Sequence, residues 1–212
     1  MSGADEPLPP EEFRALVHGA LPLFGIPDRP DRAEALARFL AELDLWRRTT
    51  NLTGRLSPPD LVAHALESVL GERFLPTGAA VVDIGTGGGF PGVPLALWRP
   101  DLSVTWLEPR RKRGEFLGHV RRALPVENAR VVVGRASALP PAAFGFATAR
   151  AVPRTGGVFG DLRFLEAGGE VLLWTTEPAG TPPELARGGF RPVDSLAVPG
   201  SLHRAIALYR RP

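Results

Sequence analysis

The chain has 212 residues, a formal net charge of +2 and no cysteine. This length fits one α/β domain with room for a helical extension, and the missing cysteine excludes a disulfide framework and a thiolate metal site. No apolar run approaches the ~20 residues of a membrane span, the first residues lack the layout of a signal peptide, and the four histidines are scattered. We therefore expect a cytoplasmic protein that binds neither a membrane nor a metal.

Residues 1–77 are predicted to form a helical extension, and residues 78–212 the main domain. Three stretches of the extension have apolar residues at helical spacing and are predicted to be helices: 10–23, 31 to about 46, and 61–70, the last capped by Asp60. A polar loop, 47–53, separates the second helix from the third. No low-complexity linker follows them, so we expect the extension to pack against the main domain.

The main domain is organised around residues 79–92. The apolar run Ala79–Ile84 predicts a short buried strand that contains a carboxylate, Asp83. Three alternate glycines follow it: Gly85, Gly87 and Gly89. Such glycines can adopt positive φ and let a ligand come close to bare main chain. With a helix expected at Val93–Trp98, the order of strand, glycine turn and helix is typical of the nucleotide-binding corner of a doubly wound α/β sheet.

The spacing favours S-adenosylmethionine (SAM) as the ligand of this turn. A carboxylate before the turn, Asp83, suits a ligand with an ammonium group and would repel a pyrophosphate. The next predicted strand, Ser103–Leu107, is followed by Glu108, which can accept hydrogen bonds from a ribose diol. Two alternatives stay open: the pattern that starts at Gly87 also satisfies the dinucleotide fingerprint, and a glycine-rich turn can lack a ligand.

The rest of the sequence alternates predicted helices and strands. Helices are expected at 110–123 and around 158–165, and strands at 129–133, 144–149, 170–174, 190–198 and 203–209. Gly168 and Gly169 are expected to form the turn before the strand at 170–174. The alternation predicts an α/β fold of the class I SAM-dependent methyltransferase (Rossmann-like) type, with helices on both faces of a parallel sheet and a C-terminal antiparallel hairpin that adds one antiparallel strand.

Several separated motifs occur in one order along the chain. They are Trp46 through Asn51-Leu52-Thr53, His64-x-x-Glu67-Ser68, Asp83 through Gly-Thr-Gly-Gly-Gly-Phe-Pro-Gly, Lys112-Arg113-x-x-Phe116-Leu117, and Arg150-Ala151. In this order they resemble the RsmG (GidB) family, the bacterial 16S ribosomal RNA guanine-N7 methyltransferases. The resemblance implies SAM as cofactor and 16S rRNA, or the small ribosomal subunit, as partner.

The resemblance also adds candidate cofactor residues to those that the turn suggests. The family's SAM site corresponds to Gly85, Phe90, Ala136, Ser137 and Arg150, which join Asp83, Gly87, Gly89 and Glu108. Some positions depart from the family: Ser137 replaces an acidic residue, Gly145 an aspartate, Ala149 a serine, and Trp174 or Thr175 a lysine.

Methyl transfer to guanine N7 needs orientation more than a base, because N7 has a free lone pair and no proton to lose. We therefore name no catalytic general base. Two alternative functions stay open: a methyltransferase of the same fold that acts on another RNA or a small molecule, favoured by Ser137 and Gly145, and a SAM-binding protein without turnover. We expect a monomer.

Candidate RNA contacts are polar and mostly basic: Arg47, Arg48, Asn51, Arg110, Arg111, Arg113, Arg150 and Arg154. Arginine suits phosphate binding, and positive charge at a helix start asks for an anionic partner. The alternative is that Arg47 and Arg48 pair with the protein's own acids, such as Glu42 and Asp44. His64, on a mostly apolar helix face, is expected to be a core histidine bonded to backbone or to Asn51.

Overall fold

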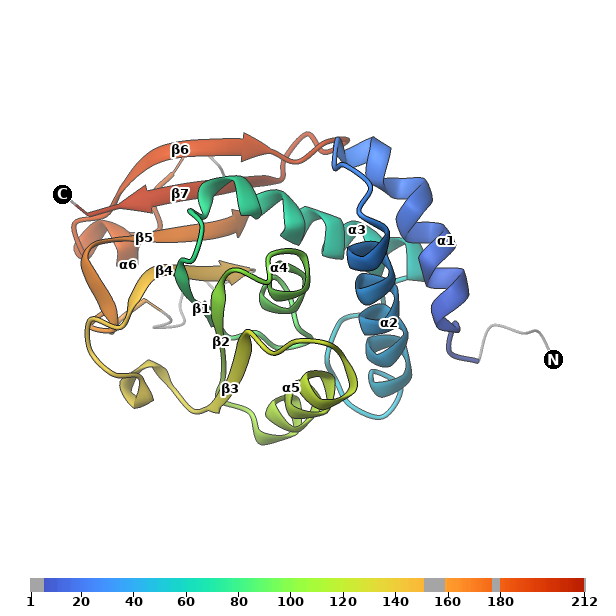
Figure 1. Cartoon of the computed structure of the whole chain (residues 1–212). Coiled ribbons are helices and arrows are strands. Elements are labelled where there is room, and N and C mark those ends of the chain that lie inside the picture. Colours follow the sequence, from blue (N-terminus) through green and yellow to red (C-terminus); the bar gives the residue numbers. More distant parts are fainter. Residues whose placement is uncertain (1–5, 151–158, 177–179, 212) are drawn as a thin grey trace.

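The computed structural model describes residues 6–150, 159–176 and 180–211. Within these ranges one seven-stranded sheet has the strand order β3-β2-β1-β4-β5-β7-β6 (Figure 1). The strands are β1 Ala80–Ile84, β2 Ser103–Glu108, β3 Ala129–Val133, β4 Phe144–Arg150, β5 Leu165–Thr175, β6 Arg191–Ala197 and β7 Ala205–Arg210. β7 runs antiparallel to β5 and β6, and the other neighbouring pairs are parallel. The predicted parallel sheet with one antiparallel strand is confirmed.

Helices precede the sheet and alternate with its strands. They are α1 Pro10–Ala20, α2 Pro30–Trp46, α3 Pro58–Val69, α4 Gly92–Trp98, α5 Arg111–Ala123 and α6 Pro183–Arg187, with short 3-10 turns η1 Leu21–Phe24, η2 Leu70–Phe74 and η3 Ala136–Ala138. Proline opens α1, α2 and α3, where its fixed φ suits the first turn and its missing N–H is not needed. Among the described residues, no helix is both long and apolar enough to cross a membrane.

The start of α3 corrects one detail of the sequence prediction. Its N-cap is Ser57, whose hydroxyl accepts a hydrogen bond from the Asp60 N–H (3.3 Å). The Asp60 carboxylate in turn accepts one from the Ser57 N–H (2.9 Å). Asp60 is therefore the second member of a capping box and not the cap itself, and the two residues together satisfy two of the N–H groups that a helix start leaves unpaired.

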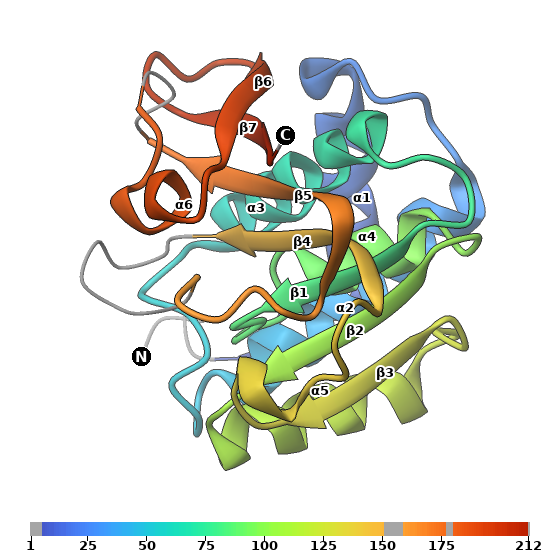
Figure 2. The same cartoon turned by 90° about the vertical axis from the view of Figure 1, so that its left-hand side faces the viewer.

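The helical extension shares a hydrophobic core with one face of the sheet. That core includes Phe39 from α2, Leu66 from α3 and Leu117 from α5 together with Trp106 and Leu208 from the strands. Figure 2 shows α1 to α4 behind the strands, with the two N-terminal helices outermost. The predicted packing of the extension against the main domain is confirmed, and the core explains it, because α2 and α3 bury their apolar faces there.

The opposite face of the sheet carries a second core that has thinner helical cover. It contains Val82, Phe144, Leu173 and Tyr209, and Leu185 of α6 packs against them. Neighbouring residues of a strand point to opposite faces, which is how each of the inner strands contributes to both cores. The predicted helices on both faces are present, although α6 has only five residues.

Two predictions for the second half of the chain need correction, and one short helix was missed. Val158 lies outside the described residues, and 159–164 form turns and extended chain, not a helix. The backbone of this segment pairs with residues 142–144, as in the bond from the Phe144 N–H to the Phe164 carbonyl (3.1 Å), so it runs beside β4 before it enters β5. Gly168 and Gly169, expected as a turn before a strand at 170–174, lie inside the longer β5, and α6 was not predicted.

Candidate active site

The carboxyl ends of β1, β2 and β4 lie side by side at one edge of the sheet, where ligands bind in open α/β folds (Figure 2). We call the part of this edge formed by the ends of β3, β2 and β1 the cofactor half. The ends of β4 and β5, with the start of β7, form the cavity half. The predicted cofactor residues divide between the two halves, and Arg150 of β4 is the member that lies in the cavity half.

The glycine turn after β1 has the backbone that the sequence predicts. Gly85, Gly87 and Gly89 have φ of 72°, 58° and 103°, a region that side chains disfavour. A Cβ placed on Gly85 would meet no atom within 4 Å, so this part of the turn faces open space. The turn therefore offers bare main chain to a ligand at Gly85.

Other glycines of the turn are required by close packing within the protein. A Cβ on Gly88 would lie 2.9 Å from the Leu52 carbonyl oxygen, and one on Gly89 would lie 2.7 Å from the Phe39 ring. Both distances are too short for a real Cβ. The turn is thus pressed against α2 and the loop at 50–53, which explains why the Asn-Leu-Thr motif and the glycine string occur together.

Glu108 fastens the turn to the end of β2. Its carboxylate accepts hydrogen bonds from the Gly87 N–H (2.9 Å) and the Arg110 N–H (2.9 Å), and the residue is 2% exposed. A carboxylate has about four acceptor positions, so these two bonds leave capacity for hydroxyl donors. Glu108 both shapes the glycine turn and stands where a ribose acceptor is expected.

Asp83 is an internal residue of β1, just before the turn. It is fully buried, and its carboxyl accepts hydrogen bonds from the Gly92 N–H (3.0 Å) and the Thr148 hydroxyl (2.9 Å). Burial raises the pKa of Asp83 to about 7, against the opposing effect of these hydrogen bonds. A Cβ on Gly92 would lie 2.6 Å from the Asp83 Oδ2, so glycine is needed there. The predicted contact between Asp83 and a ligand's ammonium group stays a prediction, because the contacts in the structure tie β1 to α4 and β4.

Phe90, Ala136 and Ser137 flank the turn on two sides. Ala136 and Ser137 lie in η3, just after β3, at the far end of the cofactor half. The Phe90 ring packs edge-on against two aromatic rings of the helical extension, Phe39 at 5.6 Å and His64 at 5.8 Å between ring centroids. Phe90 therefore joins the glycine turn to α2 and α3.

Arg150 takes part in a charge cluster in the cavity half. Its Nη2 lies 2.5 Å from Glu67 Oε2, and its Nη1 donates to the His64 carbonyl oxygen (3.1 Å). Arg204, just before β7, forms an ion pair with the other oxygen of Glu67, which is 1% exposed. Burial lowers the pKa of the Arg150 guanidinium, and Glu67 opposes this effect. The structure thus places Arg150 in an internal ion pair at the edge where a ligand role was predicted.

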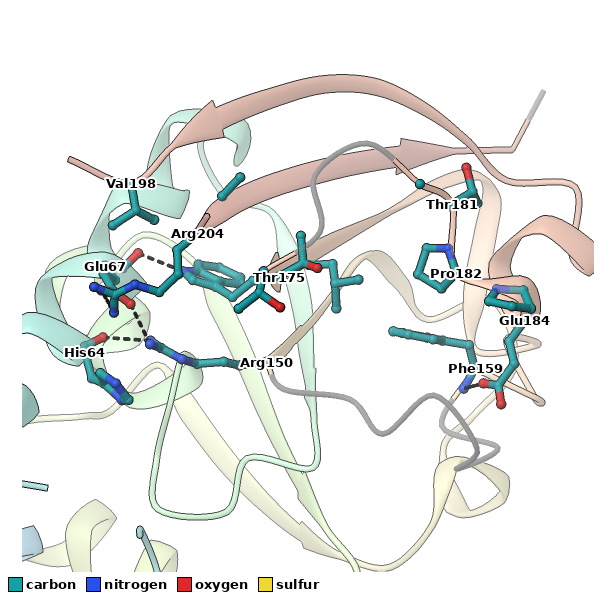
Figure 3. A pocket seen from close by; sticks show the side chains of 16 residues that line it. His64, Glu67, Arg150, Phe159, Thr175, Thr181, Pro182, Glu184, Val198 and Arg204 are labelled. Carbon is teal, nitrogen blue, oxygen red and sulfur yellow. Dashed lines mark hydrogen bonds and ion pairs between the residues drawn. The ribbon is translucent and has the colours of Figure 1, made fainter. Parts of the chain in front are cut away.

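His64 lies at the boundary between the two halves. Burial, with the positive charges of Arg150 and Arg204, lowers the pKa of His64 to about 4, so its ring is neutral at neutral pH. Its ring contacts Phe90, and the residue also lines a cavity of about 630 Å³ (Figure 3). The expected bond from the His64 ring to backbone or Asn51 stays a prediction.

Arg47 and Arg48 lie near Asp44, as the alternative interpretation of these arginines predicts. Arg47 donates to Asp44 Oδ1 through Nε (2.8 Å) and to the Leu56 carbonyl, and its side chain is 17% exposed. Arg48 Nη2 lies 3.7 Å from Asp44 Oδ2. Glu42, the other acid considered, pairs with His119 (2.7 Å) instead. The first of these arginines therefore holds the end of α2 to the loop that follows it.

The basic start of α5 is more exposed. Arg110 is its N-cap residue, and Arg111 is 90% exposed with Glu115 as its ion-pair partner. Arg113 donates to the Asn51 carbonyl oxygen (3.2 Å), which brings this predicted pair of RNA contacts together beside the glycine turn. Arg154 lies outside the described residues. No group of three or more His, Asp or Glu residues in the described ranges could hold a metal ion.

Four residues of this edge were not singled out for a site role in the sequence. They are Phe39, Glu67, Thr148 and Arg204. Glu67 and its spacing from His64 belong to the family motif, which was a usable signal, but the other three act through contacts between segments far apart in the chain. Nothing in a single sequence pairs Arg204 with Glu67.

Comparison with known proteins decides the family. Residues 32–177 match the family model described as GidB, rRNA small subunit methyltransferase G. The chain belongs to this family. A ribosomal RNA small subunit methyltransferase G of Xanthomonas axonopodis pv. citri is 38% identical over 167 residues, which cover 78% of this chain and 73% of that protein. The protein of the same name from Xanthomonas campestris pv. campestris (strain B100) is 36% identical over 91% of this chain and 84% of its own length.

Solved structures agree with the methyltransferase G assignment at the level of the fold. A MtNAS mutant in complex with S-adenosylmethionine aligns with a TM-score of 0.61 at 16% identity, over 95% of this chain and 89% of that one. A SAM-dependent methyltransferase from Aquifex aeolicus aligns with a TM-score of 0.52 at 20% identity, over 68% and 87%. The predicted Rossmann-like methyltransferase fold and the predicted family are confirmed.

The residues of the cofactor half fit the SAM that methyltransferase G proteins require. The open space above Gly85 gives room for close approach to the main chain, and the Glu108 carboxylate has acceptor capacity for a diol. The neighbouring side chains at η3 are small, which suits a flat ring system. This donor set has no feature that calls for a metal ion.

Proposed function

We propose that this protein transfers the methyl group of SAM to N7 of a guanine in 16S rRNA of the small ribosomal subunit. The observation that carries the proposal is the family match over residues 32–177, which includes the glycine turn, Glu108 and Arg150. Within this proposal the protein acts in the cytoplasm as a monomer, and sedimentation of the purified protein would test the second point.

The cofactor half is the proposed SAM site. The main chain at Gly85, Gly87 and Gly89 would hold the amino-acid part, Glu108 the ribose hydroxyls, and Ala136 and Ser137 the adenine edge. Asp83 would act through the turn, because it fixes the start of α4 at the Gly92 N–H. Phe90 and Arg150 would form the wall of the SAM site that faces the cavity. When bound, SAM supplies a methyl group on a positively charged sulfur.

The main task of the protein in this reaction is to orient the guanine N7 toward the methyl group. With SAM held in the cofactor half, the N7 lone pair would take the methyl group as its bond to sulfur breaks, so that the electron pair would stay on sulfur and the positive charge would pass to the guanine. No proton has to leave during this step, so no general base is needed, and alignment of the two reacting atoms supplies the main rate advantage. The neutral ring of His64 and the aromatic ring of Phe90 lie at the boundary where the two substrates would meet.

RNA contacts are proposed at the start of α5 and around the cavity. Arg110, Arg111 and Arg113 form a basic group beside Asn51, next to the proposed cofactor site. Contacts of this kind hold phosphates and fix the position of the RNA without reading its sequence. Arg150, Arg48 and Arg154 stay candidates from the sequence, whereas the bonds of Arg47 favour a structural role for that residue.

Methylation of isolated subunits tests the proposed function. Small subunits and naked 16S rRNA from a strain that lacks N7-methylguanine are incubated with the protein and labelled SAM, and the product is mapped by reverse transcription after cleavage at N7-methylguanine. We expect one labelled guanine. The matched control is Glu108→Ala, which should reduce labelling through cofactor affinity. If wild-type protein binds SAM yet labels neither substrate, the substrate assignment is wrong, and label on another RNA or a small acceptor would favour the alternative methyltransferase.

A further inference from the structure

The cavity of about 630 Å³ in the cavity half has no assigned ligand, and His64, which lines it, contacts Phe90 of the glycine turn. Its walls come from the ends of β4 and β5, from the segment 180–184 and from the start of β7 (Figure 3). The volume falls within the roughly 300–1,000 Å³ of ligand pockets. Because the sheet order places β4 next to β1, a group in this cavity would sit next to a ligand on the glycine turn.

The two ends of the cavity differ in charge. At one end, Arg150 and Arg204 flank the single carboxylate of Glu67, so one positive charge is in excess there. Glu184 lies at the opposite end, where it accepts a hydrogen bond from the Phe159 N–H (3.0 Å) (Figure 3). The positive end is also the end with His64, which contacts Phe90 of the glycine turn. The cavity therefore presents hydrogen-bond donors next to the cofactor half.

Arg204 is held in place while part of it stays accessible. Its Nη1 faces Glu67, its Nε donates to the Ser201 hydroxyl (3.3 Å), and 40% of its side chain is exposed. A guanidinium has five N–H donors in a fixed plane, and no hydrogen bond within the described residues uses its Nη2. A preorganised donor of this kind suits a carbonyl oxygen of a ligand in the cavity.

Hydrogen-bond donors at this end would distinguish guanine from adenine. The guanine edge that carries N7 also carries the acceptor O6, whereas adenine has an N6 amino donor at the same place. We propose that the cavity receives the acceptor guanine and that Arg204 donates a hydrogen bond to its O6, which leaves N7 facing the cofactor half. This inference rests on the proposed function and names the residue that positions and selects its substrate. Trp174, whose Nε1 donates to the Glu67 carbonyl oxygen (2.7 Å), lines the cavity at this end and offers apolar surface to the base.

Kinetics of two variants and a matched control test this inference. Arg204→Ala removes the donor, and Thr176→Trp fills the cavity from its rim. The control is Arg210→Ala, which removes an arginine from the far end of β7, where Arg210 pairs with Glu170 (2.5 Å). We expect Arg204→Ala and Thr176→Trp to lower kcat/KM for the small subunit about tenfold or more, as loss of a base contact does, with SAM affinity unchanged and Arg210→Ala near wild type. A lowered unfolding temperature with intact kcat/KM would overturn the proposal, and so would an equal loss of SAM affinity.

Arg204→Lys separates positioning from simple charge. Lysine keeps the positive charge next to Glu67 but lacks the planar fork. A purely structural ion pair would be rescued by lysine in both stability and kcat/KM, which would overturn the proposal. Recovery of the unfolding temperature without recovery of kcat/KM would support it.

A binding measurement without turnover distinguishes failure of this inference from failure of the proposed function. Saturation-transfer NMR is recorded for guanosine 5′-monophosphate and adenosine 5′-monophosphate with the protein saturated by S-adenosylhomocysteine. We expect signal for the guanine ring that Arg204→Ala and Thr176→Trp abolish, and weaker signal for adenine. This result together with no labelling of rRNA would reject the substrate and keep the guanine cavity. Equal signals for both nucleotides, or signals that the variants do not change, would reject the cavity assignment.

Discussion

In the cofactor half, most of the candidate site residues come from one short stretch of chain. In the cavity half, they come from segments that lie far apart in the sequence. Gly85 to Gly92 and Glu108 are tied together mainly through backbone N–H groups. In the cavity half, Glu67 of α3, Arg150 of β4 and Arg204 before β7 are held by their charges. Main-chain hydrogen bonds tolerate changes of neighbouring side chains, but a buried ion cluster depends on each member.

This difference predicts that single substitutions act differently in the two halves. A change in the cofactor half should alter ligand affinity while the fold stays intact. Removal of the central carboxylate of the charge cluster should alter the fold first, because it leaves the buried Arg150 without its partner. The following predictions test this contrast, beginning with the largest expected effect.

Glu67→Ala should cause the largest loss of stability. It removes the carboxylate that both Arg150 and Arg204 face, and Glu67 is 1% exposed. Removal of one partner of a buried pair costs about 3–5 kcal/mol. Urea denaturation followed by circular dichroism measures the loss. Glu115→Ala is the control, since its ion pair with Arg111 is exposed and should contribute less than about 1 kcal/mol. Similar small losses in both variants would show that the cluster does not hold the cavity half together.

Glu108→Gln should weaken SAM binding while the fold stays intact. Glutamine keeps the shape but offers one acceptor oxygen for the two backbone N–H groups that Glu108 now accepts from. The expected loss is about 1–3 kcal/mol of binding free energy, which calorimetry with SAM measures. The control is Asp101→Asn, because Asp101 lies before β2, at the opposite edge of the sheet, and bonds Arg99 and the Gly78 N–H. Equal SAM affinity in Glu108→Gln and wild type would remove Glu108 from the site.

The same contrast explains what the sequence could predict. The sequence predicted each glycine of the turn correctly. Its signals are a strand, glycines that can adopt positive φ and a following helix, and these signals are contiguous in the chain. Glu67 with Arg204 could not be predicted, because the pair exists only once α3 and β7 are brought together by the fold. Residues 159–164 were predicted as helix because their apolar spacing does not distinguish a short helix from an extended segment. In the structure, backbone pairing with 142–144 keeps this segment extended. Phe39 falls in the helix predicted from 31 to about 46, but its contact with Gly89 depends on how α2 docks.

Arg110→Ala combined with Arg111→Ala should weaken RNA binding with little effect on stability. Both residues are exposed at the start of α5. Each lost phosphate contact should reduce the slope of log affinity against log salt by about 0.7–0.9, so titrations at several salt concentrations measure the effect. Arg47→Ala is the comparison variant: its bonds to Asp44 and Leu56 predict a lower unfolding temperature with an unchanged slope. The reverse pattern would place the RNA on the loop after α2 instead.

The smallest effect concerns pH, and it involves the buried Asp83 of the cofactor half and the half-buried His64 at the boundary. Asp83 has a pKa of about 7 in the folded protein against 3.8 for the ordinary group. Between these values the folded state holds a proton that the unfolded state lacks, so stability from Asp83 falls as pH rises. His64 has a pKa of about 4 against 6.5. There the unfolded state holds the extra proton, so stability from His64 rises with pH.

The two contributions should cancel in the wild-type protein between about pH 4 and 6.5. Asp83→Asn should therefore gain a positive slope of unfolding free energy against pH relative to wild type, and His64→Gln a negative one. Urea denaturation at pH 4.5, 5.5 and 6.5 measures both slopes, and the comparison of slopes does not depend on the overall stability of each variant. Parallel curves for the two variants and wild type would show that neither group titrates differently on folding.

Phe39 and His64 contact the glycine turn, and these contacts couple ligand binding at the turn to the docking of α2 and α3. Any ligand that fixes Gly89 and Phe90 favours the states in which α2 and α3 are docked, since both helices supply a ring that packs on Phe90. By linkage, docking of the helices must favour the ligand by the same free energy. Amides of α2 and α3, whose backbone supplies none of the proposed SAM contacts, should consequently exchange more slowly with deuterium when SAM is bound, and the helical extension thus reports cofactor occupancy.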